Sequence, residues 1–284
     1  MASFEILAEA VKAAEPGLSF TILEIGALPV SDTPEPFHSL LEAFPGSRIV
    51  AFELDPRLCE SMNKHLPPAI RYYAAALGRT EETRPLYLTV MPMCTSLYRP
   101  NEALLSLYNS LDDSMLKSIG SVDTISLDRF TDEHGVADVD FVKIDVQGAE
   151  LDIFEGGTRT IGDVVAIVSE VEFVPLYVDQ PLFGDVCGFL AQQGLMFHKF
   201  TGVGGRALRP TVLNKDPTYA VQMLWADALY IRDIQKLDTS SPSKLLKLSM
   251  LAQIYGSPDL TLHCLKLYDE QRGTHVLQKV LGRM

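Results

Sequence analysis

Short apolar runs rich in β-branched residues alternate with longer amphipathic stretches from about residue 20 to residue 232. Runs such as "RIVAF" and "VVAIV" are continuously apolar, which is typical of strands buried on both faces of a parallel sheet. The alternation predicts an α/β fold with a doubly wound, mostly parallel seven-stranded sheet. The expected strands cover residues 20–26, 47–54, 70–77, 139–146, 164–173, 195–200 and 225–232, and helices are expected at 36–44, 56–66, 148–161 and 182–194.

Two segments interrupt this alternation. Residues 84–120 suggest a short strand pair followed by a helix and a loop, near the carboxyl ends of the strands, where such an insertion can cap a pocket. Residues 202–218 are marked by glycine and proline as a loop. Arg206 and Arg209 in this loop could hold an anionic substrate, although solvated loop charges are the favoured reading.

The character of the chain changes after residue 234. Residues 241–256 and 257–273 each start with serine and proline and end with glycine, which are the start and stop signals of helices. We therefore expect a main domain at 1–234 and a C-terminal helical extension at 235–284. The leucines of the extension predict a packing surface, either against the main domain or against a second copy in a homodimer.

The charge excludes some classes of protein. The formal net charge is −13, from 37 acidic and 24 basic residues, whereas nucleic acids and anionic membranes attract dense positive charge. We expect neither of these partners. The four cysteines are far apart and the N-terminus lacks the apolar core of a signal peptide, so we expect a cytoplasmic protein with reduced thiols.

Acidic residues follow the ends of the first two expected strands. Glu24 and Gly26 end the first strand, and Glu53 and Asp55 end the second. Glu53 suits the two ribose hydroxyls of an adenosine, while Asp55 before Pro56 suits a helix N-cap. The chain has neither the G-x-G-x-x-G turn of dinucleotide sites nor a P-loop. A cofactor without phosphate, S-adenosylmethionine (SAM), fits this pattern better.

The motifs "VDTISLDRF", "VDFVKIDVQGAELDIFEGG" and "VVAIVSEVEF" resemble the FkbM-type methyltransferase family. "AFELDP" and "AAALG" are similar to that family's second and third motifs, so the resemblance spans roughly residues 19–232. It implies the class I, Rossmann-like methyltransferase fold and SAM as cofactor. The cofactor-binding residues implied are Glu24, Gly26, Ala27, Glu53, Leu54, Ala76, Leu77 and Asp145.

The chain departs from the family pattern at two places. The first motif is commonly D-V-G-A-N-x-G, whereas this chain has "EIGALPVSD" and lacks the asparagine and the second glycine. Gln147 stands where the family usually has glutamate, which makes it a poor candidate for an essential base.

The expected catalytic residues are Asp145, Glu172 and Glu150. Asp145 ends an apolar strand, where a carboxylate facing the reaction centre can accept a proton from a hydroxyl nucleophile. Glu150 lies in the first turn of a helix, so a helix-dipole role is about equally expected. Lys143 would neutralise its neighbours Asp145 and Asp140.

Glu170 and Glu172 are two positions apart on a strand and share one face of the sheet. We expect at least one of them, Glu172 in preference, to reach the site. With Asp145 they could hold magnesium or calcium. The sequence offers no clear third ligand, so no metal site is predicted and a divalent cation is not favoured.

The function expected from the resemblance is SAM-dependent methyl transfer, with a hydroxyl oxygen of a sugar or secondary metabolite as the acceptor. One alternative is another adenosine-cofactor enzyme, such as a short dehydrogenase, although no convincing Tyr-x-x-x-Lys pair is present. The other alternative is a non-catalytic methyltransferase-like binding or assembly protein, which the altered first motif and the leucine-rich extension motivate.

Overall fold

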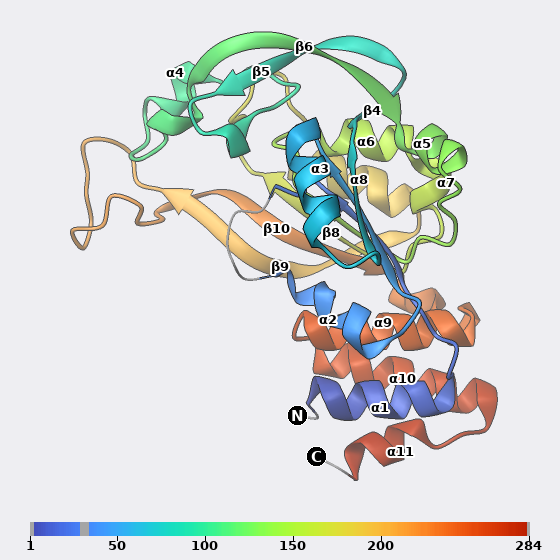
Figure 1. Ribbon diagram of the computed structural model, residues 1–284. Helices are drawn as coiled ribbons and strands as arrows, with labels where there is room; N and C mark the ends of the chain where they lie inside the picture. Colours follow the sequence, from blue (N-terminus) through green and yellow to red (C-terminus); the bar gives the residue numbers. More distant parts are fainter. Residues whose placement is uncertain (1–2, 29–33, 283–284) are drawn as a thin grey trace.

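The computed structural model describes residues 3–28 and 34–282 and is organised around a seven-stranded sheet (Figure 1). Its strands are β1 (Thr21–Ile25), β2 (Arg48–Glu53), β3 (Ile70–Ala74), β7 (Phe141–Ile144), β8 (Ala166–Glu172), β9 (Leu195–Arg206) and β10 (Gln222–Arg232). Their order across the sheet is β3-β2-β1-β7-β8-β10-β9. The expected α/β class with a mostly parallel sheet is confirmed.

The five strands from β3 to β8 run parallel, whereas β10 is antiparallel to both of its neighbours. Ile25, at the end of β1, pairs with Phe52 of β2 and Ile144 of β7. The residues that follow these three strands therefore meet at one edge of the sheet, which we call the carboxyl edge.

Helices pack on both faces of the sheet, because alternate strand residues belong to two separate apolar clusters. Ile22 and Phe141 face one cluster, and Leu23 and Val142 face the other. The first face carries α1 (Phe4–Ala14), η1 (Pro36–His38), α2 (Ser39–Ala43), α3 (Pro56–His65), α9 (Pro242–Ile254), α10 (Pro258–Arg272) and α11 (Val276–Leu281). The second face carries α5 (Leu127–Glu133), α6 (Glu150–Gly156), α7 (Thr158–Ile161) and α8 (Phe183–Gln192).

A three-stranded sheet contains the insertion and corrects two expectations. The expected strand 70–77 is divided: after β3 the chain leaves the main sheet at Ala75 and forms β4 (Ala76–Gly78), which pairs with β6 (Leu116–Ser126). The expected strand pair does not precede the helix. It consists of β5 (Glu82–Thr89) and β6, and these strands flank η2 (Pro92–Cys94), α4 (Glu102–Leu105) and η3 (Asp112–Ser114).

The expected loop at 202–218 is wrong for its first part, because β9 continues through the glycines to Arg206. The ring of Trp225 on β10 lies so close that a Cβ on Gly204 would be 2.1 Å from it. Gly204 therefore makes room for the tryptophan, and the glycines do not end the strand.

The C-terminal helices share the core of the first face. Leu245, Leu248 and Leu251 of α9 are buried in the same cluster as Val168 of β8. Figure 1 shows α9, α10 and α1 layered beneath the sheet, and η4 (Ile234–Thr239) leads into them. These three leucines of the extension are thus covered within one chain. The domain division at residue 234 and a homodimer through these helices stay predictions.

Candidate functional site

The carboxyl edge begins with a turn after β1 that only glycine can make. Gly26 has a φ of +79°, and a Cβ there would lie 1.9 Å from the backbone oxygen of Asp145. The N–H groups of Gly26 and Ala27 donate to the carbonyl of Phe52 at 3.2 and 2.9 Å. The ends of β1, β2 and β7 are therefore held together at Gly26. Residues 29–33 of the altered first motif lie outside the described residues.

Two acidic residues close β1 and β2. Glu24 Oε2 lies 3.5 Å from His38 Nε2. Glu53 Oε1 accepts hydrogen bonds from the N–H groups of Leu54 and Asp55, at 2.7 and 3.3 Å. Asp55 caps α3 by accepting from the N–H of Arg57, as the sequence predicts.

Ala76 and Leu77, the expected third-motif residues, lie in β4 and are 6% and 4% exposed. Leu77 belongs to the apolar cluster of the second face. Their side chains fill the core next to the place where the chain leaves the main sheet, so their binding role stays a prediction.

Asp145, Gln147 and Glu170 form a hydrogen-bonded chain at the centre of the edge. Gln147 Nε2 donates to Asp145 Oδ1 at 2.8 Å and to Glu170 Oε2 at 2.5 Å. The side chain of Asp145 is 40% exposed. Solvent can therefore reach the carboxylate of Asp145.

Two further carboxylates are buried beside this chain of hydrogen bonds. Glu150 is 2% exposed, and its Oε1 accepts from the N–H of Val146 at 2.8 Å, which closes the loop between β7 and α6. Burial raises the pKa of Glu150 to about 7. Glu172 is 3% exposed, and burial followed by repulsion from Glu150 and Asp145 raises its pKa well above the ordinary value.

The pKa of Glu170 is also raised well above its ordinary value, by burial and then by Asp145 and Glu172. Carboxylate oxygens of Asp145, Glu150 and Glu170 lie within 4.8 Å of one another. The sequence offered no clear third oxygen donor beside Asp145 and Glu170. The structure places Glu150 there. Such a cluster can share protons, and hard cations also favour oxygen donors of this kind.

Lys143 supplies positive charge next to the cluster. Its Nζ lies 3.1 Å from Asp227 Oδ1 and 3.9 Å from Asp145 Oδ2. Burial alone would lower the pKa of Lys143, but Asp145, Asp227 and Glu170 outweigh it and raise the pKa above its ordinary value. Of the two expected partners of Lys143, Asp145 lies beside it, whereas Asp140 is bound by Lys247.

The insertion reaches the carboxyl edge through residues that the sequence did not single out. Ser96 Oγ donates to the backbone oxygen of Gln147 at 2.6 Å. The hydroxyl of Tyr177 lies 2.9 Å from both Gln147 Oε1 and the carbonyl of Cys94. Gln147, which the sequence reading set aside as a poor base, therefore connects the strand ends with the insertion.

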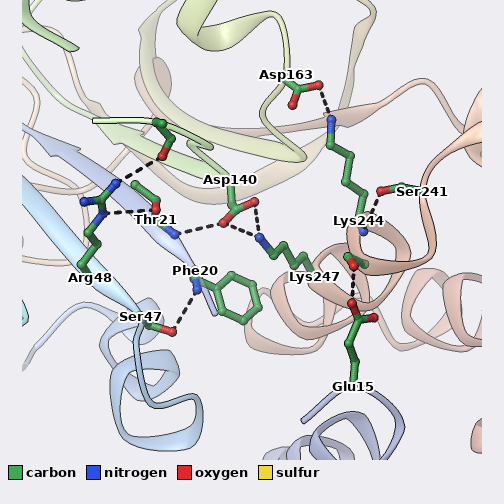
Figure 2. Close-up of polar contacts among 12 residues, drawn as sticks. Glu15, Phe20, Thr21, Ser47, Arg48, Asp140, Asp163, Ser241, Lys244 and Lys247 are labelled. Atoms are coloured by element: carbon green, nitrogen blue, oxygen red, sulfur yellow. Dashed lines mark hydrogen bonds and ion pairs between the residues drawn. The ribbon is translucent and has the colours of Figure 1, made fainter. Parts of the chain in front are cut away.

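A separate cleft of about 470 Å³ opens at the opposite, amino edge of the sheet, where α9 approaches β1 and β2 (Figure 2). Lys247 Nζ binds both oxygens of Asp140, at 2.7 and 2.8 Å, and Lys244 pairs with Asp163. Arg48 donates to Thr21 Oγ1 and to the backbone oxygen of Ala137. The two lysines that line this cleft are paired with aspartates, and the Arg48 guanidinium is hydrogen-bonded to neutral groups.

Comparison with known proteins identifies the family. Residues 24–195, more than half of the chain, match the model described as "Methyltransferase FkbM domain". The chain belongs to the FkbM methyltransferase family. The match begins at Glu24 and ends at the start of β9, so it contains the whole carboxyl edge described above.

No curated protein matches the sequence. Similar solved structures include one titled "A Pericyclic Reaction enzyme" (11% identity, TM-score 0.34, 80% of this chain and 47% of that chain). LepI in complex with SAM is another (10% identity, TM-score 0.33, 80% of this chain and 46% of that chain). The chain spans about half the length of these structures, and such TM-scores do not establish a common fold.

In the part of the chain that the structure describes, no helix is both long and apolar enough to cross a bilayer.

Proposed function

We propose that this FkbM-family protein transfers a methyl group from SAM to a hydroxyl oxygen of a small molecule, such as a sugar or a secondary metabolite. One observation carries the proposal: the glycine turn, the acidic strand ends and the Asp145 carboxylate meet at a single edge, inside the segment that matches the family. SAM carries a positively charged sulfonium, and an edge lined with carboxylates favours such a ligand.

Glu53 is the residue that we assign to the ribose. Its Oε1 is held by two backbone N–H groups, which fixes the carboxylate at the end of β2. Oε2 makes no hydrogen bond to other described residues, so it can accept from a ribose hydroxyl. Gly26 and Ala27 provide the close backbone approach that the rest of the cofactor needs. Glu24, Leu54, Ala76 and Leu77 complete the proposed cofactor site.

Asp145 is the proposed general base. Methyl transfer forms a bond from the acceptor oxygen to the methyl carbon while the bond from that carbon to sulfur breaks, which leaves S-adenosylhomocysteine. The acceptor hydroxyl loses its proton, and a partly exposed carboxylate at a strand end can accept it. Glu172 and Glu150 are more deeply buried and serve as the alternative bases. The insertion and residues 207–218 provide the acceptor pocket.

Isothermal titration calorimetry with SAM, S-adenosylhomocysteine and NAD tests the proposal. We expect saturable binding of the first two and none of NAD. Loss of a charged hydrogen bond in Glu53→Ala should weaken SAM binding about 10- to 100-fold. The control Glu60→Ala, an exposed residue on α3 that pairs only with Lys64, should bind like wild type. Asp145→Asn should still bind SAM.

Some outcomes would contradict these assignments. Wild-type affinity in Glu53→Ala would reject the ribose role of this residue. Binding of NAD alone would favour another adenosine-cofactor enzyme. Binding of none of the three would favour a non-catalytic binding protein, a candidate that the altered first motif "EIGALPVSD" supports.

A further inference from the structure

Gln147 occupies an unusual backbone position between β7 and α6. Its φ is +59°, in the left-handed region that residues other than glycine rarely adopt, and Gly148 follows with a φ of +97°. Ser96 Oγ donates to its backbone oxygen. These constraints direct the side chain of Gln147 into the carboxylate cluster instead of toward solvent.

The orientation of the Gln147 amide follows from its partners. The NH₂ group donates to Asp145 Oδ1 at 2.8 Å and to Glu170 Oε2 at 2.5 Å. The amide oxygen then faces the hydroxyl of Tyr177, which can donate to it at 2.9 Å. A single neutral side chain thus satisfies two carboxylates and one hydroxyl.

We propose that Gln147 is a positioning residue: its amide holds Asp145 and Glu170 side by side, and Ser96 ties its backbone oxygen to the insertion. Only the role of Asp145 as base rests on the proposed function. An amide keeps both of its donors at every pH. Its bridge therefore persists where a carboxylic acid in the same place would lose its proton.

The charges that surround the amide make such a bridge necessary. Carboxylates at this spacing repel one another, and neutral donors between them reduce the cost of ionising both. The titratable groups around the bridge come from six parts of the chain. They are Lys143 and Asp145 near β7, Glu150 on α6, Glu170 and Glu172 on β8, Cys94 in the insertion with Asp113 acting on it, Tyr177 after β8, and Asp227 on β10 behind Lys143.

The experiment compares urea unfolding of the full chain between pH 5.5 and 8.5, without SAM and with a chelator present. Gln147→Leu removes the donors and keeps a similar volume. At pH 8 we expect its unfolding equilibrium constant to rise about 10- to 100-fold over wild type, the usual effect of losing hydrogen bonds to charged groups. At pH 5.5 the rise should be several times smaller, because a protonated Glu170 can donate to Asp145.

Three further variants separate this role from ordinary packing. Gln147→Glu should approach wild-type stability at pH 5.5, where its acid group can donate a hydrogen bond, and lose more than Gln147→Leu at pH 8. Gln271→Leu is the matched control, because Gln271 Nε2 donates to two backbone carbonyls and not to carboxylates. The loss of stability in Gln271→Leu should not change with pH. In an Asp145→Asn background the extra loss of Gln147→Leu at pH 8 should disappear.

A loss in Gln147→Leu that is the same at every pH would overturn the proposal. If Gln147→Leu does not fold, Gln147→Glu decides alone, since equal stability relative to wild type at pH 5.5 and 8 would also overturn it. The two hypotheses fail separately: absence of SAM binding by wild type rejects the proposed function, whereas these unfolding curves decide the bridge.

Discussion

Replacing Glu150 by glutamine should stabilise the protein at high pH. Glu150 is 2% exposed and its pKa is raised to about 7, with burial as the main cause. A carboxyl group whose folded pKa is raised binds its proton more tightly in the folded state than in the unfolded state. The stability that the neutral Glu150 contributes is therefore fully present below the unfolded pKa of 4.5. It is lost as the pH rises through the folded pKa of about 7.

The magnitude follows from the two pKa values of Glu150. The difference between 4.5 and about 7 corresponds to roughly 3 kcal/mol, at about 1.4 kcal/mol per pKa unit. Glutamine is neutral at every pH and its oxygen can still accept from the N–H of Val146. The gain in unfolding free energy of Glu150→Gln should therefore be about 1 kcal/mol at pH 5 and approach about 3 kcal/mol above pH 8.

Urea unfolding, followed by fluorescence from pH 5 to 8.5 with a chelator present, measures this gain. Glu60→Gln is the control, because Glu60 is exposed and its pair with Lys64 is worth less than about 1 kcal/mol. A variant that is no more stable than wild type at pH 8, or a gain that is constant with pH, would refute the reasoning. Stabilisation of wild type by magnesium, lost in Glu150→Gln, would instead indicate a cation site.

The other predictions concern the amino edge and the glycine turn. Lys247→Met leaves buried Asp140 without its cation and should cost about 3–5 kcal/mol of unfolding free energy in urea unfolding. Lys244→Met should cost about 1 kcal/mol or less, because the partner carboxylate of Lys244 is exposed. Equal losses in the two variants would contradict the burial argument. Gly26→Ala should abolish SAM binding in calorimetry, because its Cβ would lie 1.9 Å from a backbone oxygen, whereas Gly273→Ala, with a similar φ of +66° and open space, should bind normally.

The fold could be predicted from the sequence because its elements are recorded in local patterns. Continuous apolar runs indicate the strands of a parallel sheet, and serine, proline and glycine mark the ends of helices. Parallel strands place their carboxyl ends together, so the acidic residues after them could be assigned to one edge. Glu24, Glu53 and Asp145 were placed at the carboxyl edge in this way.

The division of residues 70–77 could not be predicted, because Ala76 and Leu77 leave the sheet to pair with a strand some 48 residues further along, Ala76 with Thr124. The insertion was placed near the correct edge, but its strand order depends on the same long-range pairing. Local periodicity carries no information about which distant segment supplies the hydrogen bonds.

The sequence by itself determined the class of fold, the proposal of a site at the carboxyl edge, and the likeness to FkbM methyltransferases. Only the tertiary structure decided which side chains meet there. Lys247 rather than Lys143 binds Asp140, across 107 residues of chain, and Gln147 lies between two carboxylates where its sequence position indicated only a weak base. Such contacts depend on the register of strands and the packing of helices, because these bring residues far apart in the chain within a few ångströms of one another.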